Sequence, residues 1–445
     1  MATDLEVELL RARLDVEARR AVVPEDFPAR IQDRMARRAR GRRSLRAIVA
    51  AVVVLLVGSA AVVASRVGTP AEHTPEATTS GNEGSWQPLP EAPIDPRFQH
   101  AAVWTGQEMI VFGGYGDGPD DDRAQGAAAF DPAAGSWRTL SAPDRLRGAQ
   151  LAVWTGEEVV AFGSGEADGT TAEVAAYDPA TDDWRSVADP PDLGGGITAG
   201  VAYAVGTGDE VVVVRSVVGD NVEDVSRAAV YDPAADAWTQ LPDAPEQVPG
   251  FGDAFWTGDE VILVAPQESS GPGAPSRIVA LALDPAAGSW RSLPEPPIGP
   301  RSGMLAAWTG RELVLGGGRG HDDAVAFDPT TETWRTLPPA PVEFAGSERY
   351  GDPAVGQQVV AFRTADPDRR PLVLDVGAGR WTLGPPIDLP ELTDDRELPG
   401  RYEAPMVSTG DAVLVWGGGV ATDEGQGSTG CCRSVGEGLS FTPPT

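Results

Sequence analysis

The fold is decided by the stretch Phe130-Asp131-Pro132-Ala133-Ala134-Gly135-Ser136-Trp137, because the chain repeats it five more times. The copies lie at residues 177–184, 231–238, 283–290, 327–334 and, in a degenerate form, 374–381. With the leading Trp86, seven tryptophans stand at positions 86, 137, 184, 238, 290, 334 and 381, and they are separated by 44 to 54 residues. A repeat of about 40 to 50 residues is typical of a β-propeller or a solenoid.

Each repeat has the pattern of four short strands. In the first repeat, apolar runs at 98–104, 109–112, 127–130 and 136–140 are separated by a Thr-Gly turn, a variable loop and an Asp-Pro turn. Glycine supplies the positive φ that a tight hairpin needs. Proline presets φ for the second turn, and the aspartate side chain can accept hydrogen bonds from the backbone beyond it. Four strands joined in this way form one propeller blade.

A glycine pair follows the second strand of several repeats and would allow close approach where the inner strands crowd. It is Gly113-Gly114 in the first repeat and is kept at Gly316-Gly317 and Gly417-Gly418. The pattern leaves the local geometry of blades three, four and six open, because the pair is lost near Arg215, Ala265 and Arg363.

The repeats predict an all-β fold, a seven-bladed propeller that an N-terminal strand closes. The last blade is split, because residues 404–416 supply its inner hairpin and 438–441 its third strand. The stretch 85–89 matches the missing outer strand, and pairing the two ends would close the ring and remove the exposed edges. We expect the seven recurring tryptophans to be core residues wedged between blades, with sugar stacking as the alternative.

Four segments are predicted along the chain. Residues 1–44 form an arginine-rich, helical cytoplasmic segment, 45–66 a transmembrane helix, 67–84 a flexible linker and 85–445 the propeller. Residues 47–64 carry no charge and would span about 27 Å as a helix, close to the thickness of the hydrocarbon core. The dense arginines before this run predict a single-pass protein of the cell membrane, with its N-terminus in the cytoplasm and the propeller extracytoplasmic. A cleaved signal peptide and a nucleic-acid-binding basic run are the alternatives.

The composition excludes several kinds of chemistry. The net charge is −31, divided into +5 through Arg66 and −36 for the remainder, so the acidic body is not expected to bind nucleic acid. The sequence contains no lysine, which rules out a P-loop lysine and a lysine Schiff base. With only three histidines, at 73, 100 and 321, a three-histidine metal centre is not expected. We predict no metal and no cofactor.

The glycine pair, the aromatic-Asp-Pro phrase, the spaced tryptophans and the Pro-Arg that begins a blade at Pro96-Arg97 and Pro300-Arg301 resemble kelch repeats. That group includes the galactose-oxidase central domain, and the resemblance covers residues 85–445. It implies a kelch-type propeller, but the family includes both enzymes and binding modules. Copper oxidase chemistry is not implied, because its tyrosine, histidine and crosslinked cysteine set is not matched. The N-terminal portion resembles the arginine-rich head and single span of actinobacterial anti-sigma-like membrane proteins.

Five arginines lie just ahead of an innermost strand, and we predict that they form a ligand-binding set: Arg97, Arg147, Arg301, Arg349 and Arg401. In a closed ring these positions converge on one face, where guanidinium groups can bind carboxylate or phosphate groups. The resemblance implies the same, since arginines near this place contact acidic peptides in kelch binding modules. The structural alternative is that each arginine pairs with an acid between blades. The adjacent Cys431 and Cys432 could form a vicinal disulfide or stay reduced.

The favoured functional hypothesis is a membrane-anchored, extracytoplasmic binding module. Its arginine-lined face would meet a protein, peptide or cell-wall ligand, and no catalytic residue is predicted. The first alternative is an envelope hydrolase or lyase acting on carbohydrate, which would need a carboxyl pair near the centre of the ring. The second is a transmembrane sensor or anti-sigma-like regulator, in which residues 1–44 contact a cytoplasmic partner.

Overall fold

The computed structural model describes residues 83–444 except for a set of short segments. These are 117–123, 144–145, 147, 164–173, 192, 194–201, 220–221, 250–251, 268–275, 347–350, 367, 369, 388–403 and 422–431. The predicted cytoplasmic segment, the predicted transmembrane helix and most of the linker lie outside the described residues. Within the described ranges, no helix has the length and apolar character needed to cross a membrane.

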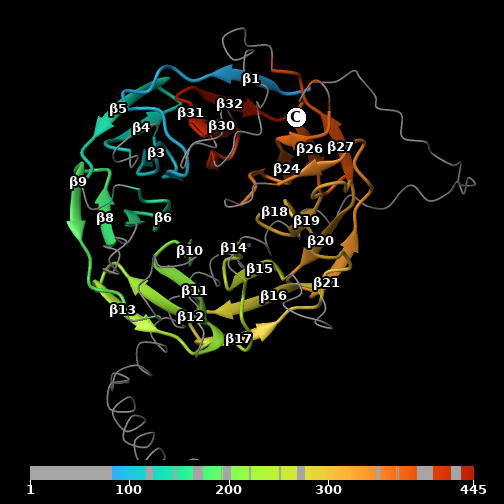
Figure 1. Cartoon of the computed structure of the whole chain (residues 1–445), viewed down its shortest axis with the longest axis horizontal. Helices are drawn as coiled ribbons and strands as arrows, with labels where there is room; N and C mark the ends of the chain where they lie inside the picture. Colours follow the sequence, from blue (N-terminus) through green and yellow to red (C-terminus); the bar gives the residue numbers. More distant parts are fainter. Residues whose placement is uncertain are drawn as a thin grey trace, which may run out of the picture. The chain divides into compact units, whose positions relative to one another are not determined.

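Seven four-stranded antiparallel sheets stand in a ring, with the first strand of each sheet innermost (Figure 1). Blades one to three are β2 (Ala101–Trp104), β3 (Met109–Phe112), β4 (Ala127–Asp131), β5 (Ser136–Leu140); β6 (Leu151–Trp154), β7 (Val159–Phe162), β8 (Val174–Asp178), β9 (Asp183–Ser186); β10 (Ala202–Gly206), β11 (Val211–Gly219), β12 (Val222–Asp232), β13 (Ala237–Gln240). Blades four and five are β14 (Asp253–Trp256), β15 (Val261–Gln267), β16 (Arg277–Asp284), β17 (Ser289–Ser292); β18 (Leu305–Trp308), β19 (Leu313–Gly316), β20 (Ala324–Asp328), β21 (Thr333–Thr336). Blade six is β23 (Ala354–Val355), β24 (Gln358–Ala361), β26 (Leu372–Asp375), β27 (Arg380–Leu383).

Blade seven joins the two ends of the described chain, as the sequence predicted. Its order is β28 (Met406–Ser408), β29 (Val413–Trp416), β32 (Gly438–Thr442) and β1 (Ser85–Pro88). β1 is antiparallel to β32, with Trp86 opposite Phe441, and Figure 1 shows the blue β1 beside the dark red β32. The predicted closure by an N-terminal strand is therefore confirmed. Two small extra sheets pair β22 (Phe344–Ala345) with β25 (Arg363–Thr364) and β30 (Gly419–Ala421) with β31 (Cys432–Ser434).

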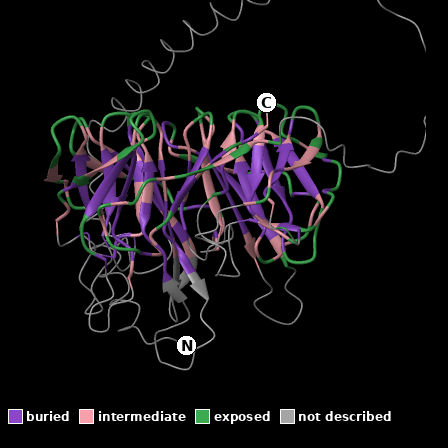
Figure 2. Cartoon of the chain, turned by 90° about the horizontal axis from the view of Figure 1, so that it is seen from above, coloured by how far each residue is buried: buried purple, intermediate pink, exposed green. Residues whose placement is uncertain are grey.

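The hydrophobic core lies between the blades, because both faces of each sheet are covered. In β3, Met109 and Val111 pack with Trp416 of blade seven, while Ile110 and Phe112 pack in the cluster shared with blade two. Side chains alternate between the two faces of a strand, so a strand covered on both faces must be apolar at every position. The outer strands are more exposed, and the purple interior and green rim in Figure 2 show this division.

The glycine pairs allow each blade to meet the chain that leads into the next. A Cβ at Gly113 would overlap the Ala149 carbonyl oxygen, and the N–H of Gly114 donates to that oxygen at 3.0 Å. In blade five the pair with positive φ is Gly317-Gly318, one residue later than the sequence pattern suggested. Only glycine adopts this conformation freely and leaves the space for such an approach.

Blades three and four, in which the sequence lacks the glycine pair, extend the hairpin formed by their second and third strands. β11 and β12 contain 9 and 11 residues, and β15 and β16 contain 7 and 8. The second and third strands of blades one, two and five contain only four or five residues. The glycine pair follows a short second strand in blades one and five, whereas the ladder extends in blades three and four, which lack it. In blade six, β24 gives way to the short β25, which pairs with β22.

Candidate functional site

The two ends of the ring differ in how the chain turns. One end, which we call the turn face, carries the Thr-Gly and Asp-Pro turns of the blades, at 105–108 and 132–135 in blade one. The opposite end, the loop face, carries the links between second and third strands and between blades, at 113–126 and 141–150 in blade one. The turn face is the upper edge of the ring in Figure 2.

The turn face is nearly uniform and bonded to itself. The Thr105 Oγ1 accepts from the N–H of Glu108 at 3.0 Å, and the Asp131 carboxylate accepts from the N–H of Ala133 at 2.8 Å. Equivalent bonds recur around the ring, and both predicted turn types are confirmed. Links on the loop face are unequal: two residues separate β11 from β12, and 21 separate β29 from β32.

Four blades carry an ion pair on the turn face that the sequence reasoning missed. The arginine after the recurring tryptophan pairs with the glutamate at the end of the Thr-Gly turn: Arg138–Glu108, Arg185–Glu158, Arg291–Glu260 and Arg335–Glu312. The signal was present, since blades with Trp-Arg also have Thr-Gly-x-Glu. These arginine side chains are 33–44% exposed, so each pair is screened by water.

Three of these arginines also reach the next blade, at the last residue of its Asp-Pro turn. The contacts join Arg138 to Asp182, Arg185 to Asp236 and Arg291 to Glu332. That turn position has positive φ in six blades and is otherwise glycine: Gly135, Asp182, Asp236, Gly288, Glu332 and Gly379. Gly135 and Gly288 follow the blades whose tryptophan precedes Gln87 and Thr239 rather than arginine. An acid therefore occupies this position only where the preceding blade supplies an arginine.

The seven recurring tryptophans each contact two blades. Every indole N–H donates, over 2.5–3.1 Å, to a backbone carbonyl in the chain that leaves the preceding blade: Trp86 to Pro385, Trp137 to Pro90, Trp184 to Ser141, Trp238 to Ala188, Trp290 to Pro242, Trp334 to Pro294 and Trp381 to Pro338. The rings are half-buried and pack in the clusters between blades. Such a large ring removes apolar area from water at each junction.

Two of the five arginines in the predicted ligand-binding set are described, and their guanidinium groups bond within the fold. Arg97 is fully buried and donates to the carbonyls of Asp95, Gly113, Gln125 and Gly126 over 2.6–3.1 Å. Burial lowers the pKa of Arg97 to about 10, an effect that the charge of Asp95 partly offsets. Arg97 thus stays protonated at neutral pH and holds the loop-face end of blade one.

Arg301 occupies the equivalent place in blade five and pairs with Asp323. It also donates to the carbonyls of Gly299 and Gly317, at 3.1 and 3.3 Å. The hydrogen bond from Arg301 lowers the pKa of Asp323. Arg97 bonds to backbone carbonyls and Arg301 to an acid of its own blade, so neither makes the pair with an acid between blades that the structural alternative expected. Arg147, Arg349, Arg401 and Cys431 lie outside the described residues, so the convergence of the arginines and the vicinal disulfide stay predictions.

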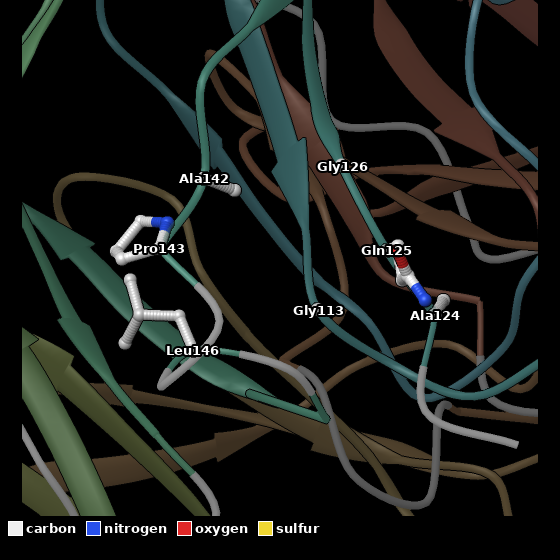
Figure 3. A pocket seen from close by; sticks show the side chains of 7 residues that line it. All are labelled: Gly113, Ala124, Gln125, Gly126, Ala142, Pro143 and Leu146. Carbon is white, nitrogen blue, oxygen red and sulfur yellow. The ribbon is translucent and has the colours of Figure 1, made fainter. Parts of the chain in front are cut away.

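A cavity of about 110 Å³ lies on the loop face next to the Arg97 contacts. Figure 3 shows Ala142, Pro143 and Leu146 on one side and Ala124 and Gln125 on the other. Gly113 and Gly126 complete the lining, and their carbonyls accept from Arg97. The lining is apolar side chain and backbone apart from the carboxamide of Gln125.

The junction of blades seven and one contains buried nitrogen atoms without hydrogen bonds. Neither imidazole nitrogen of His100 nor the indole Nε1 of Trp416 has a partner, and the two ring centroids lie 5.4 Å apart. The Arg97 and Trp416 carbonyls are close to the imidazole but outside hydrogen-bonding geometry. Burial, together with the charge of Arg97, lowers the pKa of His100 to about 3. His100 is therefore neutral in the folded protein.

Two further polar positions lie at the loop-face ends of innermost strands. Gln99 has a φ of 53° and its amide accepts from Gln150 at 3.3 Å, so it joins blades one and two in a backbone conformation that is uncommon without glycine. Asp253 begins β14, and burial of its carboxyl raises the pKa to about 7. Sequence reasoning missed both, because neither position repeats from blade to blade.

No family model matches the sequence, and no curated protein is significantly similar to it. Within the described ranges, no group of three histidine, cysteine or acidic side chains is placed to hold a metal ion. The described residues form a self-bonded turn face opposite a loop face that carries individual polar groups.

Proposed function

We propose that the protein is a membrane-anchored, extracytoplasmic binding module of the kelch type, and that its loop face contacts a protein, peptide or cell-wall ligand. The β-propeller is commonly a protein-interaction fold, and its ligand contacts depend on loops that a rigid ring positions. Residues 47–64, without charge and preceded by a dense run of arginines, support the anchor and its orientation.

The observation that carries this proposal is the direction of β1. The chain enters the ring at Ser85, which pairs with Thr442 at the turn face, and β1 then runs to the loop face at Pro88. The proposed linker, residues 67–84, is thus attached to the self-bonded face. A tether on that side leaves the loop face, with its unequal links, unobstructed and free to meet a ligand.

Photo-crosslinking with the full chain in its native membrane tests this function. A photoreactive residue is placed at Tyr115 on the loop face or at Gln107 on the turn face of the same blade, and the crosslinked species are identified by mass spectrometry. We expect a wall peptide, a glycan or a protein to be captured at least tenfold more strongly from position 115. Equal capture from both positions, or capture of a cytoplasmic factor through residues 1–44 alone, would contradict the proposal.

A second measurement tests the orientation. With a tag at each end of the chain, protease added to intact cells should remove the C-terminal tag and spare the N-terminal one. The opposite pattern would place the propeller in the cytoplasm and remove the cell-wall class of ligands.

A further inference from the structure

The cavity on the loop face has two walls that come from different links of blade one. Residues 124–126, which lead into β4, form one wall, and Ala142, Pro143 and Leu146, which follow β5, form the other. Figure 3 shows the two walls facing each other. Gln125 is exposed, whereas Leu146 is fully buried and belongs to the cluster between blades one and two. The cavity thus leads from the surface to the edge of the core.

Hydrogen bonds hold both walls in place. The buried Arg97 donates to the carbonyls of Gln125 and Gly126, at 2.6 and 3.0 Å. On the other wall, the N–H of Leu146 donates to the Pro143 carbonyl at 2.9 Å. A ligand gains more from a site whose walls are already ordered, because less entropy is lost when it binds.

The volume of the cavity limits the size of its occupant. An apolar cavity of about 150 Å³ accommodates a benzene ring, so one of about 110 Å³ takes a group smaller than an aromatic ring. A cavity of this size, open at one side, receives a side group that projects from a ligand. It does not hold a continuous stretch of polymer backbone.

The lining combines one amide with apolar side chains. The Gln125 carboxamide can donate through its NH₂ group and accept through its oxygen. Across the cavity lie the methyl group of Ala142, the ring of Pro143 and the side chain of Leu146. A group that satisfies both walls has an amide to pair with Gln125 and a methyl group to lie against Pro143 and Leu146.

We propose that this cavity is a subsite for the acetamido group of an N-acetylated sugar in an extracytoplasmic glycan. An acetamido group projects from the sugar ring, ends in a methyl group and carries one N–H and one carbonyl oxygen. Its amide can exchange hydrogen bonds with the Gln125 carboxamide, and burial of its methyl group adds to the affinity. The body of the protein has a net charge of −36, which repels acidic ligands but not this neutral group. The inference rests on the proposed binding function and names the ligand class of its loop face.

The direct test compares two sugars that differ at one position, methyl N-acetyl-β-glucosaminide and methyl β-glucoside, which has a hydroxyl in place of the acetamido group. Saturation-transfer NMR with the full chain in nanodiscs measures the binding of both. We expect the N-acetylated sugar to bind about tenfold more tightly, with the strongest saturation at its acetyl methyl group. Equal binding of the two sugars would overturn the proposal.

Two variants place the binding in the cavity. Gln125→Met keeps the length of an exposed side chain without its amide, and Ala142→Leu extends a side chain into the cavity. Each should lower the affinity for the N-acetylated sugar to that for the glucoside, and urea unfolding confirms that each variant is folded. Gln107→Met, on the exposed turn of the same blade, is the matched control and should leave the affinity within twofold of wild type. An affinity that survives in Gln125→Met and Ala142→Leu would mean that the sugar binds elsewhere.

A peptide is the other source of a projecting amide, through an acetylated N-terminus or a glutamine side chain. N-acetyl-glycine methylamide should therefore bind no more tightly than the glucoside. Binding equal to that of the N-acetylated sugar would overturn the assignment to a glycan.

The outcomes also separate this inference from the proposed function. If a photoreactive residue at position 115 captures a protein while the two sugars bind equally, the acetamido subsite is wrong and the binding module stands. If the N-acetylated sugar binds through Gln125 but position 115 captures no partner, the subsite stands and the proposed contact of the loop face with a larger ligand is wrong.

Discussion

The arginines of the two faces differ in what surrounds them. On the turn face, Arg138 and its counterparts lie half-exposed beside carboxylates, and water shares in their solvation. At the loop-face end of blade one, Arg97 is fully buried, and backbone carbonyl oxygens accept its hydrogen bonds in place of water. The ion pairs that recur in four blades should thus be weaker than the buried contact of Arg97, which occurs in one blade. Repetition marks the fold, whereas burial determines how much a contact contributes.

Replacing Arg97 should produce the largest loss of stability. Arg97→Met leaves the carbonyls of Gly113, Gln125 and Gly126 without donors in a buried place, and we expect unfolding to become easier by about 3 kcal/mol. Arg301→Met is the matched control: its partner Asp323 is 43% exposed and can be solvated, so the expected loss is about 1 kcal/mol. Urea unfolding measures both. Equal losses would mean that the exposure of an arginine's partner does not change what the contact contributes.

The buried loop-face end of blade one should also respond to pH. His100 has a pKa of about 3 when folded and 6.5 when unfolded, so below pH 6.5 only the unfolded chain takes up the proton. Stability is therefore lost as the pH falls from 6.5 toward 3, by about 2 kcal/mol between pH 6.5 and 5. His100→Phe should abolish this pH-dependent loss of stability.

The quantity to measure is the difference in unfolding free energy between wild type and His100→Phe at each pH. Asp253 has the opposite pH dependence, because its raised pKa makes the folded state the better proton acceptor between pH 7 and 4. It contributes equally to both proteins and cancels. A difference that stays constant from pH 7 to 5 would mean that the imidazole is accessible to protons in the folded state.

The sequence could predict the features that repeat from blade to blade, but not those that occur at one position. The seven tryptophans, the two turn types and the pairing of Trp86 with Phe441 were predictable, because each depends on a local pattern that recurs or on a count of strands. The extension of the strands in blades three and four was not predictable, because the absence of a glycine pair does not determine the structure that forms in its place. The roles of Arg97, His100 and Asp253 depend on which atoms surround one side chain, and a repeat pattern does not carry that information.

The turn-face ion pairs should contribute less than the buried arginine. For Arg185 and Glu158, which form two hydrogen bonds, a double-mutant cycle with Arg185→Met and Glu158→Gln should give a coupling of about 1 kcal/mol. Because the Arg185 side chain is 40% exposed, the coupling should fall when salt is raised from 0.05 to about 0.5 M. A coupling above about 3 kcal/mol that does not change with salt would mean that this pair is as strong as a buried contact, which would contradict the prediction.

The smallest effects should appear where the turn-face arginines contact an acid of the next blade, and their sign should depend on that acid. Asp236 and Glu332 both have positive φ, at 47° and 55°, and glycine would relieve that strain by about 1 kcal/mol. Asp236 accepts from the Tyr231 hydroxyl at 2.7 Å and the Ala188 N–H at 3.0 Å in addition to Arg185, whereas the contact of Glu332 is with the half-exposed Arg291.

Asp236→Gly should therefore lower the free energy of unfolding by about 0.5 kcal/mol, because the lost hydrogen bonds outweigh the relief of strain. Glu332→Gly should leave it unchanged or raise it by a similar amount, because a screened ion pair contributes little. Thermal unfolding of the two variants side by side decides the matter. If both substitutions destabilise equally, the exposed arginine contributes as much as the tyrosine hydrogen bond, and exposure does not weaken the contacts of the turn face.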